Sequence, residues 1–331
     1  MKENTMGEIK KIGVLTSGGD APGMNAAIRA VVRAAIYYGK EVSGIFKGYE
    51  GMIHNDIKKL NARSVANILH RGGTFLKSAR SMEFKTPEGM QKAWENLKSH
   101  EIDALVVIGG DGTFTGAHAF YEKYNIPIIG IPGTIDNDLS GTDSTIGYDT
   151  ASNTAMSAID NIRDTASSHD RLFFIEVMGR DAGFIAVNSG IAGGAAAIMI
   201  PEKKMTTEQL IEKLEAGAKS KKLSSLVVVA EGGKSGGAIE VAEKVKQKID
   251  SYDTKVTILG HLQRGGAPSC FDRVLASKLG VAAVEGLLAG EKDVMAGMIN
   301  NKVTYTPLLQ AVTEKKEIGE EALRVAKILS I

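Results

Sequence analysis

Leu105-Val-Val-Ile-Gly-Gly-Asp-Gly-Thr113 is an apolar segment that ends in glycines and a carboxylate. The same order recurs in Ile128-Ile-Gly-Ile-Pro-Gly-Thr-Ile-Asp-Asn-Asp138. Open parallel α/β sheets bind their ligands where strands end. Glycines let backbone N–H groups approach phosphate oxygens, and carboxylates can hold Mg²⁺ or accept a proton. The two stretches therefore predict a parallel α/β sheet with a phosphoryl-transfer site at its edge.

Apolar runs rich in Val and Ile alternate with helical stretches along almost the whole chain. The expected strands are Ile12–Thr16, Val42–Phe46, Ala104–Ile108, Pro127–Ile131, Leu172–Val177, Ala196–Ile200, Ser225–Ala230 and Val256–Leu259. The expected helices include Met24–Tyr38, Pro87–Ser99, Thr150–Ser167, Thr207–Ser220, Ala238–Ser251 and Phe271–Leu288. Alternation of strands and helices indicates a parallel α/β architecture, and continuously apolar strands indicate sheets covered by helices on both faces.

Two local signals refine this organisation. Thr206 or Thr207 is the expected N-cap of one helix, with the acidic Glu208 in its first turn. Gly147-Tyr-Asp-Thr150, where a long helix begins, is the expected domain boundary. The sequence has no Pro/Ser-rich linker, so we expect short crossings between two domains, the number that the length favours.

Composition and charge exclude several classes of protein. Forty basic residues balance 39 acidic ones, so no bulk charge attracts nucleic acid or an anionic membrane. Cys270 is the only cysteine, which excludes an intramolecular disulfide and suits a reducing cytoplasm. Residues 1–8 are polar, and no run approaches the roughly 18 apolar residues of a spanning helix. We therefore expect a cytoplasmic protein without nucleic-acid or membrane partners.

Taken singly, the loops leave alternatives open. Leu15-Thr-Ser-Gly-Gly-Asp-Ala-Pro-Gly-Met-Asn25 can bind anions at a helix N-terminus, although it matches neither G-x-G-x-x-G nor a P-loop, and a structural turn is the alternative. Asp111 could cap a helix instead of binding a metal, and the run around it also resembles the nucleotide loops of NAD kinases and lipid kinases. Asp136-Asn-Asp138 could be a solvated acidic turn.

Cations accompany glycines in several further loops. These loops are His70-Arg-Gly-Gly-Thr-Phe-Leu-Lys-Ser-Ala-Arg80, Ser168-His-Asp-Arg171, Met178-Gly-Arg180 and His261-Leu-Gln-Arg-Gly-Gly266. A single arginine is commonly a solvated surface charge, but repeated placement beside glycines favours phosphate binding by the guanidinium fork. The six histidines show no metal-ligand spacing, so the sequence predicts no zinc site.

Together, these motifs closely resemble the ATP-dependent 6-phosphofructokinase family of the bacterial homotetrameric type. The resemblance extends from Lys11 to about Ala289, with a weaker C-terminal tail. The runs that match in order and spacing are Ile12–Arg29, Arg71–Arg80, Ile102–Thr113, Pro132–Gly147, Glu176–Arg180 and Gly260–Gly266. The resemblance implies two similar Rossmann-like α/β lobes with mainly parallel sheets. An ATP-binding lobe would comprise residues 1–147 with about 262–313, and a sugar-phosphate-binding lobe residues 148–261 with about 314–331.

The implied activity is glycolytic transfer of the ATP γ-phosphoryl group to the 1-hydroxyl of fructose 6-phosphate, giving fructose 1,6-bisphosphate and ADP. Asp136 matches the general base, Thr134 and Arg180 match groups that steady the transferred phosphoryl, and Asp138 would lie close to the metal. The implied metal is Mg²⁺, held by Asp111. The implied ATP site comprises Gly19, Tyr49, Arg80, Gly110, Asp111, Gly112 and Thr113.

By the same resemblance, fructose 6-phosphate is bound by residues of both lobes and of a neighbouring subunit. Arg171 and Lys255 would enter the adjacent subunit's site of a homotetramer. Lys255 stands where the family usually has an arginine, and it keeps the charge without the bidentate geometry. The implied sugar-phosphate residues are Thr134, Ile135, Asp136, Arg171, Met178, Gly179, Arg180, Glu231, Lys255, His261 and Arg264.

The phosphoryl donor can also be inferred from the resemblance. Pyrophosphate-dependent members carry Asp and Lys where this chain has Gly112 and Gly133. We expect small residues there to leave room for the α-phosphate of a nucleotide, so the resemblance implies ATP as donor.

An allosteric site is implied with departures. The effector-binding residues would be Arg29, Arg33, Arg163, Lys221 and Lys222. Ala196 replaces an acidic ligand of the effector's Mg²⁺, and Ala62 replaces an effector-binding arginine, so we expect a weakened response to ADP or phosphoenolpyruvate. The alternatives are a non-catalytic sugar-phosphate sensor, which would be expected to lack Asp111, Asp136 or Arg80, and a kinase for another acceptor, such as a related hexose 6-phosphate or a nucleoside.

Overall fold

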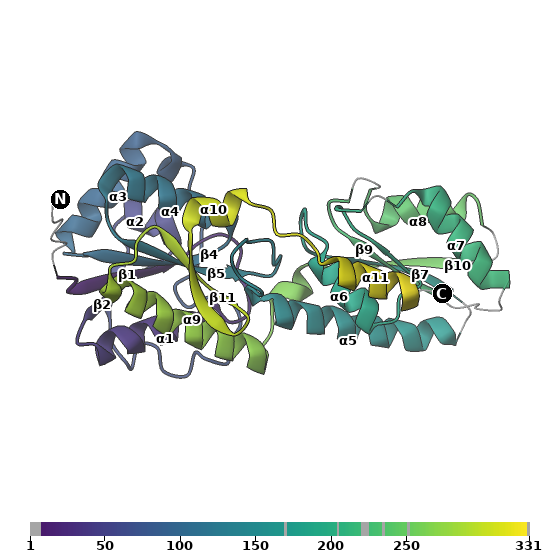
Figure 1. Cartoon of the computed structure of the whole chain (residues 1–331), viewed down its shortest axis with the longest axis horizontal. Helices are drawn as coiled ribbons and strands as arrows, with labels where there is room; N and C mark the ends of the chain where they lie inside the picture. Colours follow the sequence, from purple (N-terminus) through teal and green to yellow (C-terminus); the bar gives the residue numbers. More distant parts are fainter. Residues whose placement is uncertain are drawn as a thin grey trace. The chain divides into compact units, whose positions relative to one another are not determined.

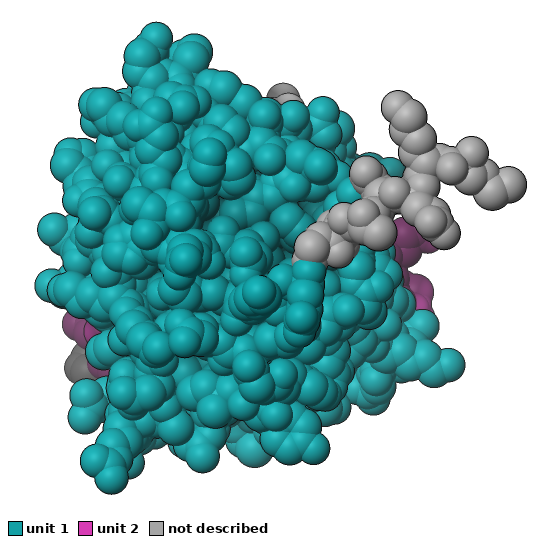
Figure 2. Space-filling view, turned by 90° about the vertical axis from the view of Figure 1, so that its left-hand side faces the viewer, with its two compact units in different colours: residues 1–134, 139–149, 264–315 teal, residues 135–138, 150–263, 316–331 magenta. Residues whose placement is uncertain are grey.

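Two sheets, each in its own unit, organise the chain. The computed structural model describes residues 8–168, 171–203, 205–219, 225–233, 236–249 and 252–329. Unit 1 comprises Met1–Thr134, Leu139–Asp149 and Arg264–Lys315, and unit 2 comprises Ile135–Asp138, Thr150–Gln263 and Lys316–Ile331. Figure 2 colours the residues of the two units separately. The chain therefore passes between the units several times.

The sheet of unit 1 has the strand order β12-β11-β5-β4-β1-β2-β3, with β6 paired to β5. The pairs β2–β3 and β11–β12 are antiparallel, and all other neighbours are parallel. The strands are β1 (Lys11–Thr16), β2 (Glu41–Ile45), β3 (Ile57–Leu60), β4 (Ala104–Gly109), β5 (Ile128–Thr134), β6 (Ile146–Gly147), β11 (Val294–Ile299) and β12 (Lys302–Pro307). The three central strands β5, β4 and β1 are almost completely buried, which is why they are nearly continuously apolar.

Helices cover both faces of this sheet (Figure 1). The helices of unit 1 are α1 (Met24–Tyr37), α2 (Gly48–Ile53), α3 (Pro87–Ser99), α4 (Asp111–Tyr124), α9 (Cys270–Ala289) and α10 (Leu308–Thr313), with the 3₁₀ turn η1 (Glu83–Lys85). α1 and α9 lie against each other on one face, where a Cβ at Gly280 would come within 2.5 Å of the Ala30 side chain. A glycine is therefore required at this helix crossing.

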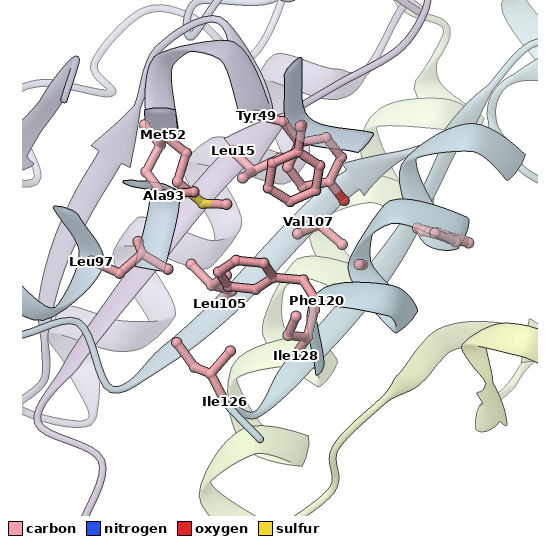
Figure 3. Close-up of a cluster of buried hydrophobic side chains, with 14 of the residues drawn as sticks. Leu15, Tyr49, Met52, Ala93, Leu97, Leu105, Val107, Phe120, Ile126 and Ile128 are labelled. Atoms are coloured by element: carbon pink, nitrogen blue, oxygen red, sulfur yellow. The ribbon is translucent and has the colours of Figure 1, made fainter. Parts of the chain in front are cut away.

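The other face carries a hydrophobic cluster of buried residues (Figure 3). Its residues come from the sheet and from α2, α3 and α4, and the aromatic ring of Phe120 lies among them. Labelled members are Leu15, Tyr49, Met52, Ala93, Leu97, Leu105, Val107, Phe120, Ile126 and Ile128. This packing fixes α4 against β4 and β5, and α4 begins where β4 ends.

Unit 2 is built on a parallel sheet of order β10-β7-β9-β8. Its strands are β7 (Arg171–Val177), β8 (Ala197–Met199), β9 (Ser225–Ala230) and β10 (Asp253–Ile258). Its helices are α5 (Tyr148–Ser167), which starts in unit 1, α6 (Phe184–Ala192), α7 (Thr207–Lys219), α8 (Ala238–Lys246) and α11 (Glu320–Leu329). The 3₁₀ turn η2 (Gly260–Arg264) follows β10. Leu172 and Phe174 of β7 pack against residues of α7 and α8.

The predicted α/β class with mainly parallel sheets is confirmed, and α3 has the predicted bounds. Thr206 is the N-cap of α7, because its hydroxyl accepts from Gln209 N–H at 3.2 Å while Gln209 Oε1 accepts from Thr206 N–H at 3.0 Å. This reciprocal pair is a capping box.

Several expectations about single elements were wrong or incomplete, and the clearest concern β10, α4 and the β11–β12 pair. β10 begins at Asp253, three residues before the predicted start, and it is an edge strand in which Ile258 is 51% exposed, so helices do not cover both its faces. The helix α4 and the hairpin β11–β12 were not predicted. Among the described residues, no helix combines the length and the apolar character that crossing a membrane requires.

Candidate active site

Three acidic or glycine-rich loops follow neighbouring parallel strands of the unit 1 sheet. Thr16 of β1 pairs with Ile108 of β4, and Gly109 pairs with Pro132 of β5. Ser17 N–H also donates to Ile108 O at 3.0 Å, which ties the first loop to the end of β4. Because the carboxyl ends of β1, β4 and β5 share one edge, the predicted nucleotide loops are brought together at the edge where such sheets bind ligands.

The start of α4 offers an anion-binding helix terminus at this edge. Gly110 is the N-cap and makes no side-chain cap, and the exposed Asp111 lies in the first turn. A Cβ at Gly112 would meet no atom within 4 Å. Backbone N–H groups at a helix N-terminus favour a phosphate, and open space at Gly112 lets one approach.

Thr113, in the same turn, has an unusual hydroxyl. The residue is 2% exposed, and its Oγ1 has no hydrogen-bond partner among the described residues. A Cβ at Gly109 would lie 2.3 Å from this oxygen, and Gly18, whose φ is +84°, would place one 3.3 Å away. The glycines thus let two loops close around a polar atom that is left to interact with something other than described protein atoms.

Tyr49, on α2, contacts the first turn of α4. Its ring stacks on Phe84 with centroids 4.1 Å apart, and its hydroxyl donates to Thr113 O. Burial raises the pKa of the Tyr49 hydroxyl above its usual range, so this group stays a donor. The Tyr49 hydroxyl is therefore used to hold the first turn of α4.

Gly19 and Arg264 meet in unit 1. Arg264 Nη1 donates to Asp20 O at 3.2 Å, and a Cβ at Gly19 would lie 2.8 Å from the same nitrogen. Arg80, predicted for the ATP site, is exposed. The structure thus joins a predicted sugar-phosphate residue, Arg264, to the predicted ATP loop.

Thr134 ends β5 beside the start of α4. A Cβ at Gly110 would lie 3.4 Å from Thr134 Cβ, and Thr145 Oγ1 donates to Thr134 O at 2.6 Å. The expectation that Gly133 leaves open space was wrong, because its Cβ would lie 3.0 Å from Ile108 and 3.2 Å from Met24. Core packing favours a glycine at position 133, whereas a Cβ at position 112 would lie in open space.

Residues 135–138 continue from β5 but cluster with unit 2. Ile135 and Asp136 are buried, with Asp136 8% exposed, and Asp138 is half-buried. Asn137 has a left-handed φ of 55°, and its side-chain oxygen accepts from Lys316 Nζ at 3.0 Å. The acidic turn is therefore not the solvated surface turn that the sequence left open.

In unit 2, the loop Met178–Arg180 follows β7 and is held by acceptors from two other segments. Glu231 Oε1 accepts from Arg180 N–H at 2.9 Å and from Gly179 N–H at 3.3 Å. The buried Gln263 accepts from Met178 N–H at 3.2 Å through its Oε1. Gly179 and Arg180 have φ values of 144° and 55°, so these acceptors stabilise a turn that is strained at the non-glycine residue. The exposed Arg180 and His261 side chains lie on loops at the carboxyl ends of β7 and β10.

Gln263 was missed by sequence reasoning. It lies between the predicted residues His261 and Arg264, but nothing in its neighbours signals that its amide is buried against β7. Its Nε2 also donates to Gly260 O at 3.1 Å, so the amide is held at both ends.

Arg171 and Lys255 lie at the opposite end of the unit 2 sheet. Arg171 Nε donates to Asp253 Oδ2 at 2.9 Å, and Lys255 Nζ lies 2.8 Å from Asp253 Oδ1. Lys255 and Arg171 together hold the pKa of the Asp253 carboxyl below its usual value. Arg171 begins β7, whereas Met178 follows its last residue, so strand geometry separates them by about 20 Å.

The predicted effector residues divide between the units. Arg29, Arg33 and Ala62 line one cavity of about 650 Å³ in unit 1, together with Glu285. Arg163 and Ala196 belong to unit 2, where Arg163 approaches Gly194. Lys221 and Lys222 lie outside the described residues.

Comparison with known proteins gives consistent matches. A family model described as phosphofructokinase matches residues 11–287. ATP-dependent 6-phosphofructokinase 2 of Bacteroides thetaiotaomicron is 55% identical over 98% of this chain and 100% of its own length. ATP-dependent 6-phosphofructokinase 1 of Thermus thermophilus is 54% identical over 98% of this chain and 100% of its own. The phosphofructokinase structure from Saccharomyces cerevisiae is 39% identical with a TM-score of 0.87, over 97% of this chain and 46% of that one.

Proposed function

The chain belongs to the phosphofructokinase family, and on that premise we propose that it transfers the γ-phosphoryl group of ATP to the 1-hydroxyl of fructose 6-phosphate. The family predicted from the sequence is thereby confirmed. The observation that carries the proposal is the meeting of the β1, β4 and β5 loops at one sheet edge, in a chain whose relatives named ATP-dependent 6-phosphofructokinase match nearly its full length.

Kinases of this family need a divalent metal, and we propose Mg²⁺ held by Asp111. The exposed Asp111 carboxylate is a ligand of the type that Mg²⁺ prefers, and the unpaired Thr113 hydroxyl in the same turn fits a phosphate oxygen or a hydrated metal. A bound Mg²⁺ would neutralise phosphate charge as it builds up in the transition state.

The ATP phosphates are proposed to lie against the first loop and the α4 N-terminus. Gly19 and Gly110 to Thr113 offer backbone N–H groups, and Arg80 offers an exposed guanidinium. For Tyr49 we propose a positioning role, because its hydroxyl binds Thr113 O and its ring is buried on Phe84. Open space at Gly112 suits a nucleotide phosphate, which supports ATP as donor.

For the chemical step, Asp136 is proposed as the general base. Its carboxylate takes the proton of the sugar 1-hydroxyl while that oxygen attacks the γ-phosphorus and the bond to the ADP oxygen breaks. A positioned base of this kind contributes about 10²–10⁴-fold. Thr134 and Arg180 are proposed to donate to the equatorial oxygens, where negative charge spreads in a loose transition state.

The sugar phosphate is proposed to bind at the carboxyl edge of the unit 2 sheet. The turn Met178–Arg180, Glu231 and His261 all follow the ends of neighbouring strands there. The other residues proposed for the sugar phosphate are Thr134, Ile135, Asp136 and Arg264. Glu231 also positions the turn, since one of its oxygens already accepts two backbone N–H groups.

Arg171 and Lys255 are proposed to serve another subunit of a homotetramer. Along the strands, Arg171 lies about 20 Å and Lys255, which pairs with Phe173, about 17 Å from Met178, so neither is placed to contact a sugar phosphate held by the Met178–Arg180 turn of its own unit. Both are paired with Asp253, which presents them as one cationic cluster.

Other features follow the family more loosely. We propose that unit 1 carries most of the ATP site and unit 2 most of the sugar-phosphate site, and that the protein is cytoplasmic. We also propose that the cavity at Arg29 and Arg33 takes an anionic effector. Arg163, Lys221 and Lys222 remain proposed effector residues. The cavity wall at Ala62 lacks a cation. The missing cation supports a weak response to ADP or phosphoenolpyruvate.

The test is a coupled assay of ADP release with ATP and fructose 6-phosphate. We expect turnover with this pair and none when pyrophosphate replaces ATP. Tagatose 6-phosphate and unphosphorylated fructose serve as acceptor controls. Faster turnover with another acceptor would make that compound the substrate, and binding of fructose 6-phosphate without any turnover would favour a sugar-phosphate sensor.

A further inference from the structure

A histidine and two carboxylates from distant parts of the chain converge on the flank of unit 1. His118 and Glu122 are four residues apart on α4, and Asp293 precedes β11. One ligand atom from each of the three residues lies within 4.8 Å of the others. Residues four apart lie on one helix face, so α4 directs both side chains to the same side.

The arrangement is fixed before any ligand binds. His118 Nδ1 lies 2.8 Å from Asp293 Oδ2, and these side chains are 23% and 17% exposed. Asp293 has a left-handed φ of 53°, and its backbone carbonyl accepts from Leu308 N–H at 2.9 Å. Two of the three groups are therefore held by a helix and by a hydrogen-bonded turn, which is the rigidity that a metal site needs.

One atom in the cluster lacks a partner. Asp293 Oδ1 is buried and makes no hydrogen bond among the described residues. A buried carboxylate oxygen without a donor is costly. Glu122 adds a second negative charge, and among the described residues the protonated form of His118 is the cation that pairs with Asp293.

We propose that His118, Glu122 and Asp293 bind a divalent transition metal of the zinc class. One imidazole nitrogen and two carboxylate oxygens form a donor set that suits Zn²⁺ or Co²⁺ better than Mg²⁺. Metal bonds of about 2.0–2.1 Å put neighbouring ligand atoms roughly 3 Å apart, close to the separation of His118 Nδ1 and Asp293 Oδ2. The metal replaces the proton in the hydrogen bond between His118 Nδ1 and Asp293 Oδ2, and the exposed Glu122 carboxylate binds the metal as the third ligand.

The site is separate from the proposed catalytic metal. His118 lies seven residues after Asp111 on α4, about 10 Å along the helix axis. Its ligands join α4 to the segment between α9 and β11, so the bound ion would stabilise unit 1 without taking part in the reaction. Histidine spacing alone could not have found this site, because only one ligand is a histidine and the third comes from a distant segment.

The experiment is calorimetric titration of the metal-free full chain with Zn²⁺ and Co²⁺, in a Cys270→Ser background because Cys270 is an exposed thiol. We expect one ion per chain with a Kd of about 10 μM or tighter. His118→Gln and Asp293→Asn should each weaken binding by at least about tenfold. Asn tolerates the left-handed backbone at position 293, so that variant should fold.

Two controls separate this site from others. His100→Gln removes a histidine whose Nε2 lies 2.7 Å from Asn55 Oδ1, outside the cluster, and should leave Zn²⁺ affinity unchanged. Asp111→Asn should also leave it unchanged. No Zn²⁺ binding up to about 100 μM, equal affinity in the His118→Gln variant, or loss of binding in Asp111→Asn would each overturn the proposal.

Discussion

The carboxyl edges of the two sheets use their backbone donors in opposite ways. In unit 1, the N-cap of α4 makes no side-chain bond, and Gly112 faces open space. In unit 2, the N–H groups of Met178, Gly179 and Arg180 are all taken by Gln263 or Glu231. Unit 1 can therefore bind an anion through its backbone. In unit 2 the backbone N–H groups are used to fix the turn that carries the charged Arg180 side chain.

This difference suits the two proposed ligands. A chain of phosphates with a metal presents many oxygens to a glycine-lined surface, where close approach matters most. A sugar phosphate presents one charged end and several hydroxyls, and guanidinium and imidazole groups on a fixed turn can distinguish them. Substitutions at each edge should therefore affect different kinetic constants.

The largest effect is expected at the segment that leaves the unit 1 sheet and joins unit 2. Asp136→Ser should lower kcat by about 10²–10⁴-fold or more with little change in either KM, because proton transfer occurs only in the transition state. Steady-state kinetics with ATP and fructose 6-phosphate measure this. Asp56→Ser, a surface carboxylate paired with Lys58, is the matched control and should behave as the unchanged protein. A decrease in kcat of less than tenfold would show that Asp136 is not the general base.

The second effect concerns the open backbone of unit 1. Gly112→Asp fits sterically, because a Cβ there meets nothing within 4 Å, so its effect should be electrostatic. A carboxylate against the nucleotide phosphates should lower kcat/KM for ATP by about 100-fold, since a few kcal/mol of like-charge repulsion has that effect. Gly112→Asn has the same shape without charge and should retain most activity. Equal losses in both variants would show that space, not charge, governs the position.

Much of this contrast between the two sheet edges could be predicted from the sequence. The elements that were missed were missed for physical reasons. Buried strands such as β1 and β4 are continuously apolar, so their ends were found to within a residue, whereas β5 continues three residues beyond its predicted end at Ile131. α4 was missed because Gly112, Gly116 and several aromatic or β-branched residues weaken its helical pattern, and packing against the sheet stabilises it instead. The β11–β12 hairpin was missed because β12 is largely exposed.

Which polar groups hold which loops could not be predicted. Gln263 and Glu231 bind the Met178–Arg180 turn across many residues of sequence, and a single sequence carries no signal for such pairs. The role expected for Gly133 was wrong for a related reason, since its neighbours Ile108 and Met24 come from other elements.

The third effect tests the far end of the unit 2 sheet. Arg171→Ala should raise the half-saturating concentration of fructose 6-phosphate by about 10- to 100-fold, the value of one charge-assisted contact, and leave that of ATP unchanged. Arg324→Ala, which removes an exposed arginine paired with Glu321, is the control. Light scattering of the unchanged protein should show a tetramer. A fully active monomer would contradict the shared site.

The fourth effect tests whether unit 2 uses Glu231 as a backbone acceptor. Glu231→Ala leaves two N–H groups without their partner and should raise the KM for fructose 6-phosphate by about tenfold. Glu231→Gln keeps an acceptor oxygen and should recover much of the loss, whereas a role through charge alone would make Gln as harmful as Ala. The KM for ATP should not change in either variant.

The smallest effect is expected in the proposed effector cavity, where Arg29 and Arg33 are cations but position 62 is an alanine. Arg29 and Arg33 lie one turn apart on α1 and line the cavity with Ala62. An effector shifts a conformational equilibrium only through its differential affinity for the two states, and a complete allosteric coupling is about 1–3 kcal/mol. With a cation missing at Ala62 and no carboxylate at Ala196 for an accompanying Mg²⁺, ADP should shift half-saturation by less than about tenfold.

Ala62→Arg sharpens this prediction. It adds a guanidinium to a cavity that already presents two, so it should strengthen ADP binding through a charge-assisted contact and enlarge the shift. Ala62→Gln fills similar space without charge and should leave the response as weak as in the unchanged protein. The measurement is an ADP titration at sub-saturating fructose 6-phosphate. A complete allosteric site is expected to shift the half-saturating fructose 6-phosphate concentration by more than about tenfold. If ADP causes such a Mg²⁺-dependent shift in the unchanged protein, residues other than those at positions 62 and 196 supply the contacts.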